Sequence, residues 1–316
     1  MAKIKVAIVG YGHLGKWHAQ KAECFPERAE LKYIVEKFPA GREAAKVAHP
    51  QVIVVEDISE CINDIDAAFV VTPTTFHFEL VEYLLNHNKH VFCEKPVTET
   101  TPQSLKLKEL LKNKELVLQV GHSERFHQAW ERKENYKQFF NSPAHITLKR
   151  VAPFKGRATD VDVVQDLMIH DLDLLVYLFG ETPISVESVG FKMRTNRYDY
   201  VSSNFKFQSG HRATITVGRN QTKEVRELEI SNKSGTLLVD LMKNEIQEAL
   251  GANTGPEYVS LDKYEKRDHL MLEHKHFYES ILNHKEPIVS LEDGLLAVAL
   301  IDKVIESVES GKEVVI

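Results

Sequence analysis

The sequence is poor in cysteine and has no long apolar run, and both absences restrict what the protein can be. Its 316 residues include three cysteines, which are scattered without the spacing of metal ligands. This pattern suits packing roles in a reducing compartment and argues against a metal site. No stretch approaches the roughly 20 apolar residues of a membrane-spanning helix, and the N-terminus shows no signal-peptide pattern. We therefore expect a cytoplasmic protein that binds neither metal nor membrane.

Basic clusters and repeats are also missing. The formal net charge is −6 at pH 7 and the lysines are dispersed, so the chain offers no basic stripe to nucleic acid. We find no internal repeat and no low-complexity segment. A composition with 43% hydrophobic and 27% charged residues is ordinary for a globular protein, and the length allows two domains with cores of their own.

The N-terminal segment carries a dinucleotide-binding motif. Residues 4–9 form an apolar, β-branched run that predicts a strand buried on both faces of a parallel sheet. The next six residues have the spacing G-x-G-x-x-G, which allows a tight turn, close approach of the backbone to a pyrophosphate, and close packing of the following helix. The motif predicts cofactor contacts at Gly10, Gly12, His13, Leu14 and Gly15.

Glu36 ends the second strand-like run, about 20 residues after the glycines, as the dinucleotide fingerprint requires. A carboxylate there accepts hydrogen bonds from the adenosine ribose and repels the 2′-phosphate of NADP. We therefore predict NAD as the cofactor. Lys37 weakens this prediction, because a cation at the next position could receive a 2′-phosphate.

Strand-like and helix-like runs alternate through the first 120 residues, which predicts a doubly wound parallel sheet. The further strand-like runs are 52–55, 67–71, 90–93 and 116–120, and amphipathic stretches include 76–86 and 104–113. After the fourth strand we expect a small polar segment to line the nicotinamide ribose: Thr72, Pro73, Thr74 and His77. The same segment could instead be a helix start with Thr74 or Thr75 as its N-cap.

The tripeptide Glu94-Lys95-Pro96 follows the strand-like run 90–93. Proline disfavours the α region for the residue before it, so Lys95 is expected in an extended or turn conformation at the carboxyl end of the strand. Open α/β sheets bind ligands at this edge. We therefore place Glu94 and Lys95 beside the cofactor, although such a tripeptide seen alone is more often a surface turn.

The second half has a different pattern. Residues 129–140 read as a helix, residues 183–248 contain successive strand-like runs joined by turns, and two helical stretches follow at 269–283 and 293–310. Strands without intervening helices imply a mostly antiparallel sheet. The expected fold class is α/β: an N-terminal Rossmann domain, 1–122, and a C-terminal α+β domain, 123–316. A sheet with one uncovered face also makes a homo-oligomer, a dimer or tetramer, plausible.

Asp166 and His170 are four residues apart in an expected helix, which puts them on one face. A carboxylate beside an imidazole raises its basicity and fixes its orientation, as a proton acceptor near neutral pH requires. The alternative is an acidic helix N-terminus that interacts favourably with the helix dipole.

Together with the glycine motif and Glu94-Lys95-Pro96, this pair resembles the Gfo/Idh/MocA oxidoreductase family along essentially the whole chain. The resemblance implies that Lys95 is the catalytic lysine, that Asp166 and His170 are the Asp-x-x-x-His pair, and that Asp173 is the acid that usually follows. Family members commonly have glycines just before the catalytic helix, whereas this chain has Val163-Val164-Gln165, so the shape of the substrate loop does not carry over.

Three stretches, 71–74, 121–126 and 166–171, resemble the branch of the family that oxidises C3 of UDP-N-acetylglucosamine in lipid A diamino-sugar synthesis. One departure is His127-Gln128, where that branch tends to have Asn-Pro. Guanidinium groups suit a diphosphate, although their alternative role is structural or solvated charge. The predicted substrate contacts are Lys95, Arg125, Phe126, Lys155, Arg157, Asp166 and His170.

The implied reaction is NAD-dependent oxidation of a secondary sugar hydroxyl. His170 would act as the base, oriented by Asp166, while Lys95 donates a hydrogen bond to the developing alkoxide. Which of Lys95 and His170 takes the proton first stays open. The alternatives are a dehydrogenase of a free polyol or monosaccharide, and a non-catalytic cofactor-sensing regulator, against which the intact set of Lys95, Asp166 and His170 argues.

Overall fold

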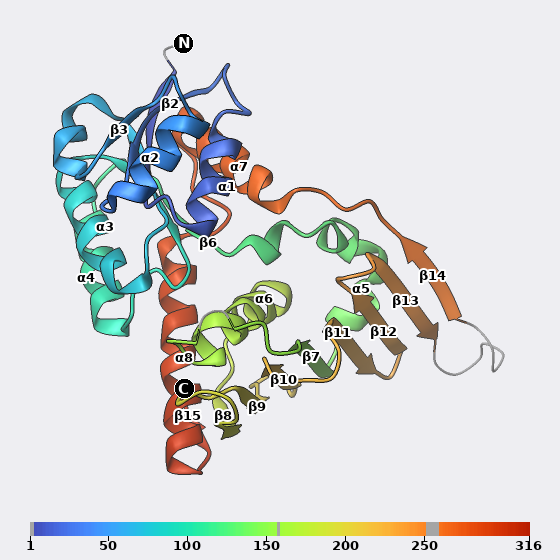
Figure 1. Cartoon of the computed structure of the whole chain (residues 1–316). Helices are drawn as coiled ribbons and strands as arrows, with labels where there is room; N and C mark the ends of the chain where they lie inside the picture. Colours follow the sequence, from blue (N-terminus) through green and yellow to red (C-terminus); the bar gives the residue numbers. More distant parts are fainter. Residues whose placement is uncertain (1–2, 157–158, 251–258) are drawn as a thin grey trace. The chain divides into compact units, whose positions relative to one another are not determined.

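The computed structural model describes residues 3–156, 159–250 and 259–316 (Figure 1). The chain divides into two compact units. The first comprises residues 1–123 and 268–298, and the second comprises residues 124–267 and 299–316. Among the described residues, no helix has both the length and the apolarity needed to cross a membrane.

The first unit is built on a six-stranded sheet in which every neighbouring pair is parallel. The strand order is β3-β2-β1-β4-β5-β6, so the order reverses between β1 and β4, where doubly wound sheets bind their ligands. This confirms the Rossmann fold expected from the sequence. The strands are β1 (Ile4–Val9), β2 (Ala29–Val35), β3 (Ile53–Val55), β4 (Ala67–Val70), β5 (His90–Glu94) and β6 (Leu118–Gly121).

A helix from the far end of the chain completes the core of the first unit. Phe277 and Tyr278 of α7 are fully buried and pack with Phe69 of β4 and Phe92 of β5. The sequence predicted the bounds of α7 but not its membership of this unit. The helices here are α1 (His13–Ala22), α2 (Pro39–Ala48), α3 (His77–Asn86), α4 (Thr101–Leu111) and α7 (His269–Asn283), with short 3-10 turns at Ile58–Glu60, Ile62–Asp64 and Thr74–Phe76.

Two helix starts differ from the sequence prediction. Thr74 and Thr75 lie in a 3-10 turn and cap nothing, because α3 begins only at His77. Helix α4 begins at Thr101, three residues before the start expected from hydrophobic pattern alone. The earlier start has a local cause, since Gln103 accepts a hydrogen bond from the backbone N–H of Thr100 at 3.2 Å.

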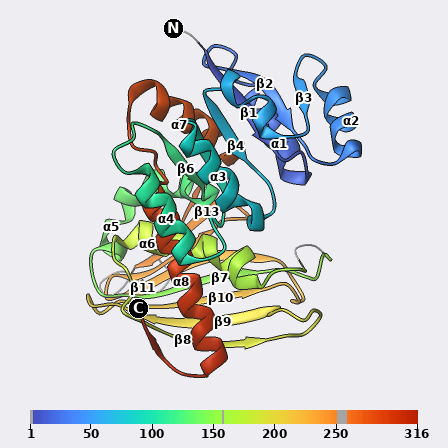
Figure 2. The ribbon, with the colours of Figure 1, turned by 90° about the vertical axis from the view of Figure 1, so that its left-hand side faces the viewer.

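The second unit contains a large sheet (Figure 2), which has nine strands among the described residues; β7 and β10 pair in parallel and the other described neighbours pair antiparallel. The mostly antiparallel sheet expected from the sequence is therefore confirmed. Its order is β14-β13-β12-β11-β7-β10-β9-β8-β15. The strands are β7 (His145–Val151), β8 (Ser185–Phe191), β9 (Tyr200–Lys206), β10 (Arg212–Gly218), β11 (Val225–Asn232), β12 (Gly235–Asp240), β13 (Glu245–Leu250), β14 (Val259–Lys263) and β15 (Val314–Val315).

The helices of the second unit are α5 (Lys137–Phe140), α6 (Ile169–Phe179) and the part of α8 (Leu291–Ser310) that follows residue 298. The prediction of one helix over 129–140 was wrong. Residues Gln128–Tyr136 form 3-10 turns instead, and only the last residues are α-helical. One contact that stabilises these turns is local, because the indole N–H of buried Trp130 donates to the carbonyl of Glu124, six residues earlier, at 2.8 Å.

Candidate functional site

The glycine loop of the first unit has the geometry that a dinucleotide requires. Gly10 has a φ of +95°, and a Cβ there would lie 2.7 Å from the carbonyl oxygen of Val71. A Cβ at Gly15 would lie 2.0 Å from the carbonyl oxygen of Gly10, so α1 packs too closely against the loop for any side chain. A Cβ at Gly12 would meet nothing within 4 Å, which leaves open space at the start of α1. The backbone N–H groups at a helix start bind a pyrophosphate in such a space.

The Glu36 carboxylate is fixed beside this loop. Its Oε2 accepts the backbone N–H of Tyr11 at 2.7 Å and its Oε1 accepts that of Phe38 at 2.8 Å. Gly41 leaves room for it, since a Cβ there would lie 2.6 Å from Cγ of Glu36. A carboxylate held at the end of β2 suits a ribose diol, so the residues present fit NAD.

Arg42 is a neighbour of Glu36 that the sequence prediction missed. Its Nη1 donates to the backbone carbonyls of Glu36 at 3.1 Å and Lys37 at 2.6 Å. Its Nη2 pairs with Glu56 at 3.0 Å. The guanidinium therefore braces the turn after β2. Its position on α2, six residues after Glu36, gave no sequence signal for this role.

His77 joins the loops that follow β4 and β5. It is buried, with Nδ1 2.7 Å from the carbonyl oxygen of Pro96 and Nε2 2.9 Å from that of Thr72. Burial lowers the pKa of His77, although both carbonyls favour the protonated ring. His77 thus fixes the backbone on both sides of the predicted nicotinamide site.

Lys95 lies at the carboxyl end of β5, half-buried, as the sequence predicted for its strand position. The Glu94 carboxylate before it is buried, and its Oε2 accepts the backbone N–H of Lys95 at 3.2 Å. Burial alone would raise the pKa of Glu94, but the hydrogen bond with His18 and the charge of Lys95 hold that pKa below its usual value. A buried anion therefore contacts the backbone of the candidate catalytic lysine.

Asp166 and His170 lie on one continuous helical segment of the second unit, but not in regular α-helix throughout. Residues Val164–Met168 form a π turn, closed by the backbone N–H of Ile169 to the carbonyl of Val164, and α6 follows. Asp166 therefore lies in the π turn and His170 in the first turn of α6, so the spacing argument for a regular helix does not apply across the junction. Single π turns occur frequently at functional sites.

Arg125 makes contacts typical of a structural ion pair. Its Nε lies 3.1 and 2.9 Å from the two carboxylate oxygens of Asp173, and its Nη2 lies 2.6 Å from Oδ1. The guanidinium also stacks over the ring of Tyr177 at 4.8 Å. Both partners of the pair are buried. Substrate binding by Arg125 stays a prediction.

The remaining predicted substrate contacts are placed as follows. Phe126 is buried beside Arg125 in the 3-10 turn Ser123–Phe126. Lys155 is exposed and pairs with Glu224 at 2.7 Å. Arg157 lies outside the described residues.

A buried ionic cluster in the second unit was not predicted at all. Arg150 of β7 forms a two-pronged contact with Asp171 of α6, at 3.0 and 2.8 Å, and donates to Glu124 at 2.9 Å. Arg226 also donates to Glu124, at 3.1 Å. Burial alone would raise the pKa of Glu124, but the two arginines lower it to about 2. The cluster fixes α6, and hence His170, on the sheet.

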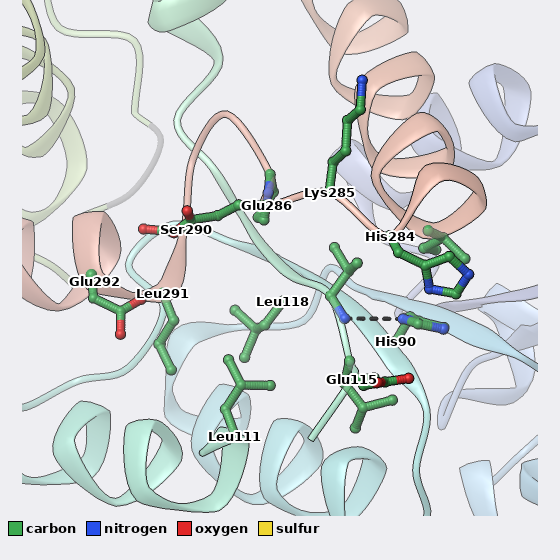
Figure 3. A pocket seen from close by; sticks show the side chains of 14 residues that line it. His90, Leu111, Glu115, Leu118, His284, Lys285, Glu286, Ser290, Leu291 and Glu292 are labelled. Atoms are coloured by element: carbon green, nitrogen blue, oxygen red, sulfur yellow. Dashed lines mark hydrogen bonds between the residues drawn. The ribbon is translucent and has the colours of Figure 1, made fainter. Parts of the chain in front are cut away.

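A pocket of about 620 Å³ lies at the opposite edge of the Rossmann sheet from the glycine loop (Figure 3). It is lined at the amino ends of β5 and β6 by His90 and Leu118, by His284 directly after α7, and by Leu291 at the start of α8. No residue of the predicted site lines it. Within residues 3–156, 159–250 and 259–316, no group of three or more His, Cys, Asp or Glu side chains could hold a metal ion.

A parallel Rossmann sheet with this glycine loop and a fixed acid after β2 defines a class: NAD-binding oxidoreductases. Two family models match the chain. Residues 4–122 match the oxidoreductase family with an NAD-binding Rossmann fold, and residues 157–316 match the C-terminal alpha/beta domain of the same family. The chain belongs to the Gfo/Idh/MocA oxidoreductase family. It is a dehydrogenase that acts on a CH–OH group and uses NAD.

Curated relatives cover nearly the whole chain. A UDP-N-acetylglucosamine 3-dehydrogenase of Acidithiobacillus ferrooxidans is 31% identical, covering 90% of this chain and 91% of its own. Its solved structure has a TM-score of 0.88, with 28% identity, and the match covers 98% of this chain and 99% of that one. An inositol 2-dehydrogenase of Rhizobium meliloti is 27% identical and the match covers 98% of each chain.

Proposed function

We propose that the protein oxidises the C3 hydroxyl of UDP-N-acetylglucosamine to the 3-keto sugar nucleotide with NAD as the oxidant. The observation that carries this proposal is the whole-length similarity to an enzyme named for that reaction, in sequence and in fold. The ordered Rossmann loop, Lys95, and the helical segment with Asp166 and His170 supply the parts that such a reaction needs.

Each side chain has a separate task in the proposed reaction. NAD, when bound, supplies a nicotinamide ring whose C4 accepts the hydride. His170 takes the hydroxyl proton and Asp166 orients the imidazole. Lys95 donates a hydrogen bond to the oxygen as negative charge develops on it, which lowers the barrier electrostatically.

The cofactor contacts in this proposal follow the ordered loops of the first unit. The backbone after β1 binds the pyrophosphate, Glu36 binds the adenosine ribose, and the segments after β4 and β5 border the nicotinamide ribose. The proposed contacts are Gly10, Gly12, His13, Leu14, Gly15, Glu36, Thr72, Pro73, Thr74, His77, Glu94 and Lys95.

The context of the reaction is also a proposal. We place the enzyme in the cytoplasm, in the synthesis of diamino-sugar lipid A, and we divide it functionally into a cofactor domain, 1–122, and a substrate and oligomerisation domain, 123–316. An oligomer through the second sheet is supported by two large apolar side chains that are exposed on one face of β8, Val189 and Phe191.

A polyol dehydrogenase is the second candidate, because the inositol 2-dehydrogenase relative matches the chain over its full length. The ion pair of Arg125 with Asp173 favours this candidate slightly. A guanidinium already neutralised by a buried carboxylate is less available to a diphosphate.

The two candidates are separated by a coupled assay. The enzyme is incubated with UDP-N-acetylglucosamine, NAD, glutamate and a sugar-nucleotide aminotransferase, since the ketone must be removed if its formation is uphill. Mass spectrometry is expected to show an amino-sugar nucleotide. Absence of that product, with rapid reduction of NAD by free inositol or glucose, would establish the polyol candidate instead.

Two variants test the assigned roles. Lys95→Ala and His170→Ala should each lower kcat by roughly 100-fold or more while NAD binding stays near normal. The matched controls are Lys112→Ala and His145→Ala, which remove an exposed lysine of the first unit and an exposed histidine of the second. Near-normal turnover in Lys95→Ala or His170→Ala would remove that residue from the mechanism.

A further inference from the structure

Four buried polar side chains of the first unit form a continuous line of contacts, and the proposed reaction gives a role to only one of them, Glu94 as a cofactor contact. Glu94 Oε1 lies 3.1 Å from Nε2 of His18, and Nδ1 of His18 lies 3.0 Å from Nε2 of His274. Nδ1 of His274 lies 3.2 Å from the hydroxyl of Tyr278. The two histidines and the tyrosine are 0% exposed, and Glu94 is 8% exposed.

These side chains come from three elements that are distant in sequence. His18 lies in the middle of α1, the helix that begins at the glycine loop, while His274 and Tyr278 lie one turn apart on α7. Glu94 ends β5. The His274 ring also stacks on Phe69 at 4.2 Å, which fixes its plane. The line therefore joins the cofactor helix and α7 to the residue that precedes Lys95.

Counting donors and acceptors gives this line a direction. A carboxylate only accepts, so His18 must donate from Nε2, and a neutral His18 then accepts at Nδ1. His274 must in turn donate from Nε2 and accept at Nδ1, where Tyr278 donates its hydroxyl proton. Burial lowers the pKa of His274 well below its ordinary value, which agrees with a neutral ring. All three contacts are then satisfied with one anion and no cation in the line.

We propose that Tyr278, His274, His18 and Glu94 form one directional chain of hydrogen bonds, and that His18 and His274 are positioning residues for the catalytic lysine. This rests on the proposed function, in which Lys95 acts on the substrate oxygen. The chain keeps Glu94 as an anion in one orientation, and Glu94 holds the backbone N–H of Lys95 through its second oxygen. His18 and His274 act through Glu94, so they need not touch the substrate.

This chain of hydrogen bonds fixes the position of Glu94 and does not conduct protons. At one end, Tyr278 is fully buried in the apolar core with Phe25 and Phe277, and burial raises its pKa. At the other end, the contact between Glu94 and Lys95 is with a backbone amide, whose proton does not exchange in catalysis. A positioning role requires neither an exit to solvent nor a mobile proton.

The first test reads the direction of the chain without activity. In protein labelled with ¹⁵N-histidine, long-range ¹H–¹⁵N spectra distinguish the two neutral tautomers and the cation. Difference spectra of His18→Gln and His274→Gln assign the two signals among the 15 histidines. Both rings are expected to be neutral with the proton on Nε2. A cationic ring, or a proton on Nδ1 in either histidine, would overturn the proposed direction.

Glu94→Gln provides a sharper version of the same test. The N–H of Lys95 needs an acceptor, so the amide oxygen of the new side chain turns toward it and the NH₂ faces His18. His18 must then accept at Nε2 and donate from Nδ1, and His274 must do the same toward Tyr278. Both tautomers are expected to switch together. If only His18 switches, or neither does, the two histidines do not form one chain.

The second test separates positioning from general stability. His18→Leu should lower kcat about 10- to 100-fold through displacement of Lys95, with the NAD dissociation constant changed less than about threefold. His18→Gln, which can still donate to Glu94, should recover most of kcat. His90→Asn is the matched control, because His90 is a partly buried imidazole at the other end of β5, where it accepts the N–H of Val117.

Equal loss of kcat in His18→Leu and His18→Gln would show a merely structural role, and unchanged kcat in both would remove His18 from positioning. If no sugar nucleotide or polyol is turned over at all, the proposed function is wrong. The tautomer measurements then still show whether the four side chains form the proposed chain of hydrogen bonds.

Discussion

Replacement of Asp199 by asparagine should destabilise the second unit strongly, because this carboxylate is fully buried and accepts hydrogen bonds from backbone, hydroxyl and guanidinium donors. Its Oδ2 accepts the backbone N–H groups of Met193 and Arg194 at 2.7 Å and of Thr195 at 2.9 Å. Its Oδ1 accepts the Thr195 hydroxyl at 2.9 Å and Nε of Arg219 at 2.7 Å. Burial alone would raise the pKa of Asp199, but these donors hold it well below the usual value.

Asparagine cannot satisfy this set of donors. Each carboxylate oxygen of Asp199 accepts at least one N–H, so the NH₂ group of asparagine would face another donor in either orientation. The buried Arg219 would also lose its counter-charge. Removing one partner of a buried ion pair typically costs about 3 to 5 kcal/mol. We expect a loss of that size in the free energy of unfolding. An exposed pair such as Lys303 with Glu306 should contribute only about 0 to 1 kcal/mol, so Glu306→Gln is the control.

The two tryptophans allow the measurement to be made on one unit. Trp17 lies in the first unit and Trp130 in the second, so Trp17→Phe leaves Trp130 as the single tryptophan of the chain. Urea unfolding followed by its fluorescence then reports the second unit. A change of less than about 1 kcal/mol in Asp199→Asn would refute the reasoning, because the buried pair would then be worth no more than an exposed one.

The same carboxylate should also affect catalysis. Arg219 donates to the carbonyl of Val161 at 2.9 Å, and the N–H of Val163 donates to the carbonyl of Tyr198 at 3.0 Å. These contacts hold the segment directly before the π turn that carries Asp166. In Asp199→Asn we therefore expect kcat to fall more than NAD affinity, measured in native buffer where the variant is folded.

Three further changes test other parts of the molecule. Glu36→Ala should weaken NAD binding and reduce the difference between the dissociation constants for NAD and NADP, because the acceptor for the ribose hydroxyls and the charge that repels a 2′-phosphate are lost together. A wild-type protein that binds NADP more tightly than NAD in fluorescence titrations would contradict this. Gly121→Ala should lower kcat, since its Cβ would lie 2.9 Å from Oε1 of Glu94 and displace the carboxylate; an unchanged kcat would contradict this expectation. The pKa of Glu124 is about 2 in the folded protein and about 4.3 when unfolded, so its stabilisation is complete above pH 4.3 and is lost as the pH falls toward 2. Trp130 fluorescence should show this acid transition, and Glu124→Gln should weaken its pH dependence.

The sequence predicted the Rossmann half well because its signals are local. Each signal lies within a few tens of residues: the glycine spacing, the acid after the second strand and the apolar runs. Strands and helices can also be told apart, because their apolar residues recur with different periods. Strand bounds such as β1 (Ile4–Val9) and the helix α7 (His269–Asn283) were correct to the residue. Of the candidate site, the sequence identified residue types at strand ends and in one helix, but not the π turn at Asp166.

Contacts between distant segments could not be predicted in the same way. Arg125 and Asp173 are 48 residues apart, and His18 and His274 are 256 residues apart. No periodicity links such pairs, so neither the ion pair nor the buried chain left a signal in the sequence.

Helix α1 connects these local and distant features. Its first residues face the open space at Gly12, where a pyrophosphate fits, and His18 follows five residues after the helix start, about 7.5 Å along the axis. The same helix thus positions the cofactor loop and, through His18, the Glu94 carboxylate that accepts the backbone N–H of Lys95. The close packing that Gly15 permits therefore serves both the pyrophosphate site and the position of His18, because a helix displaced from Gly10 would move both.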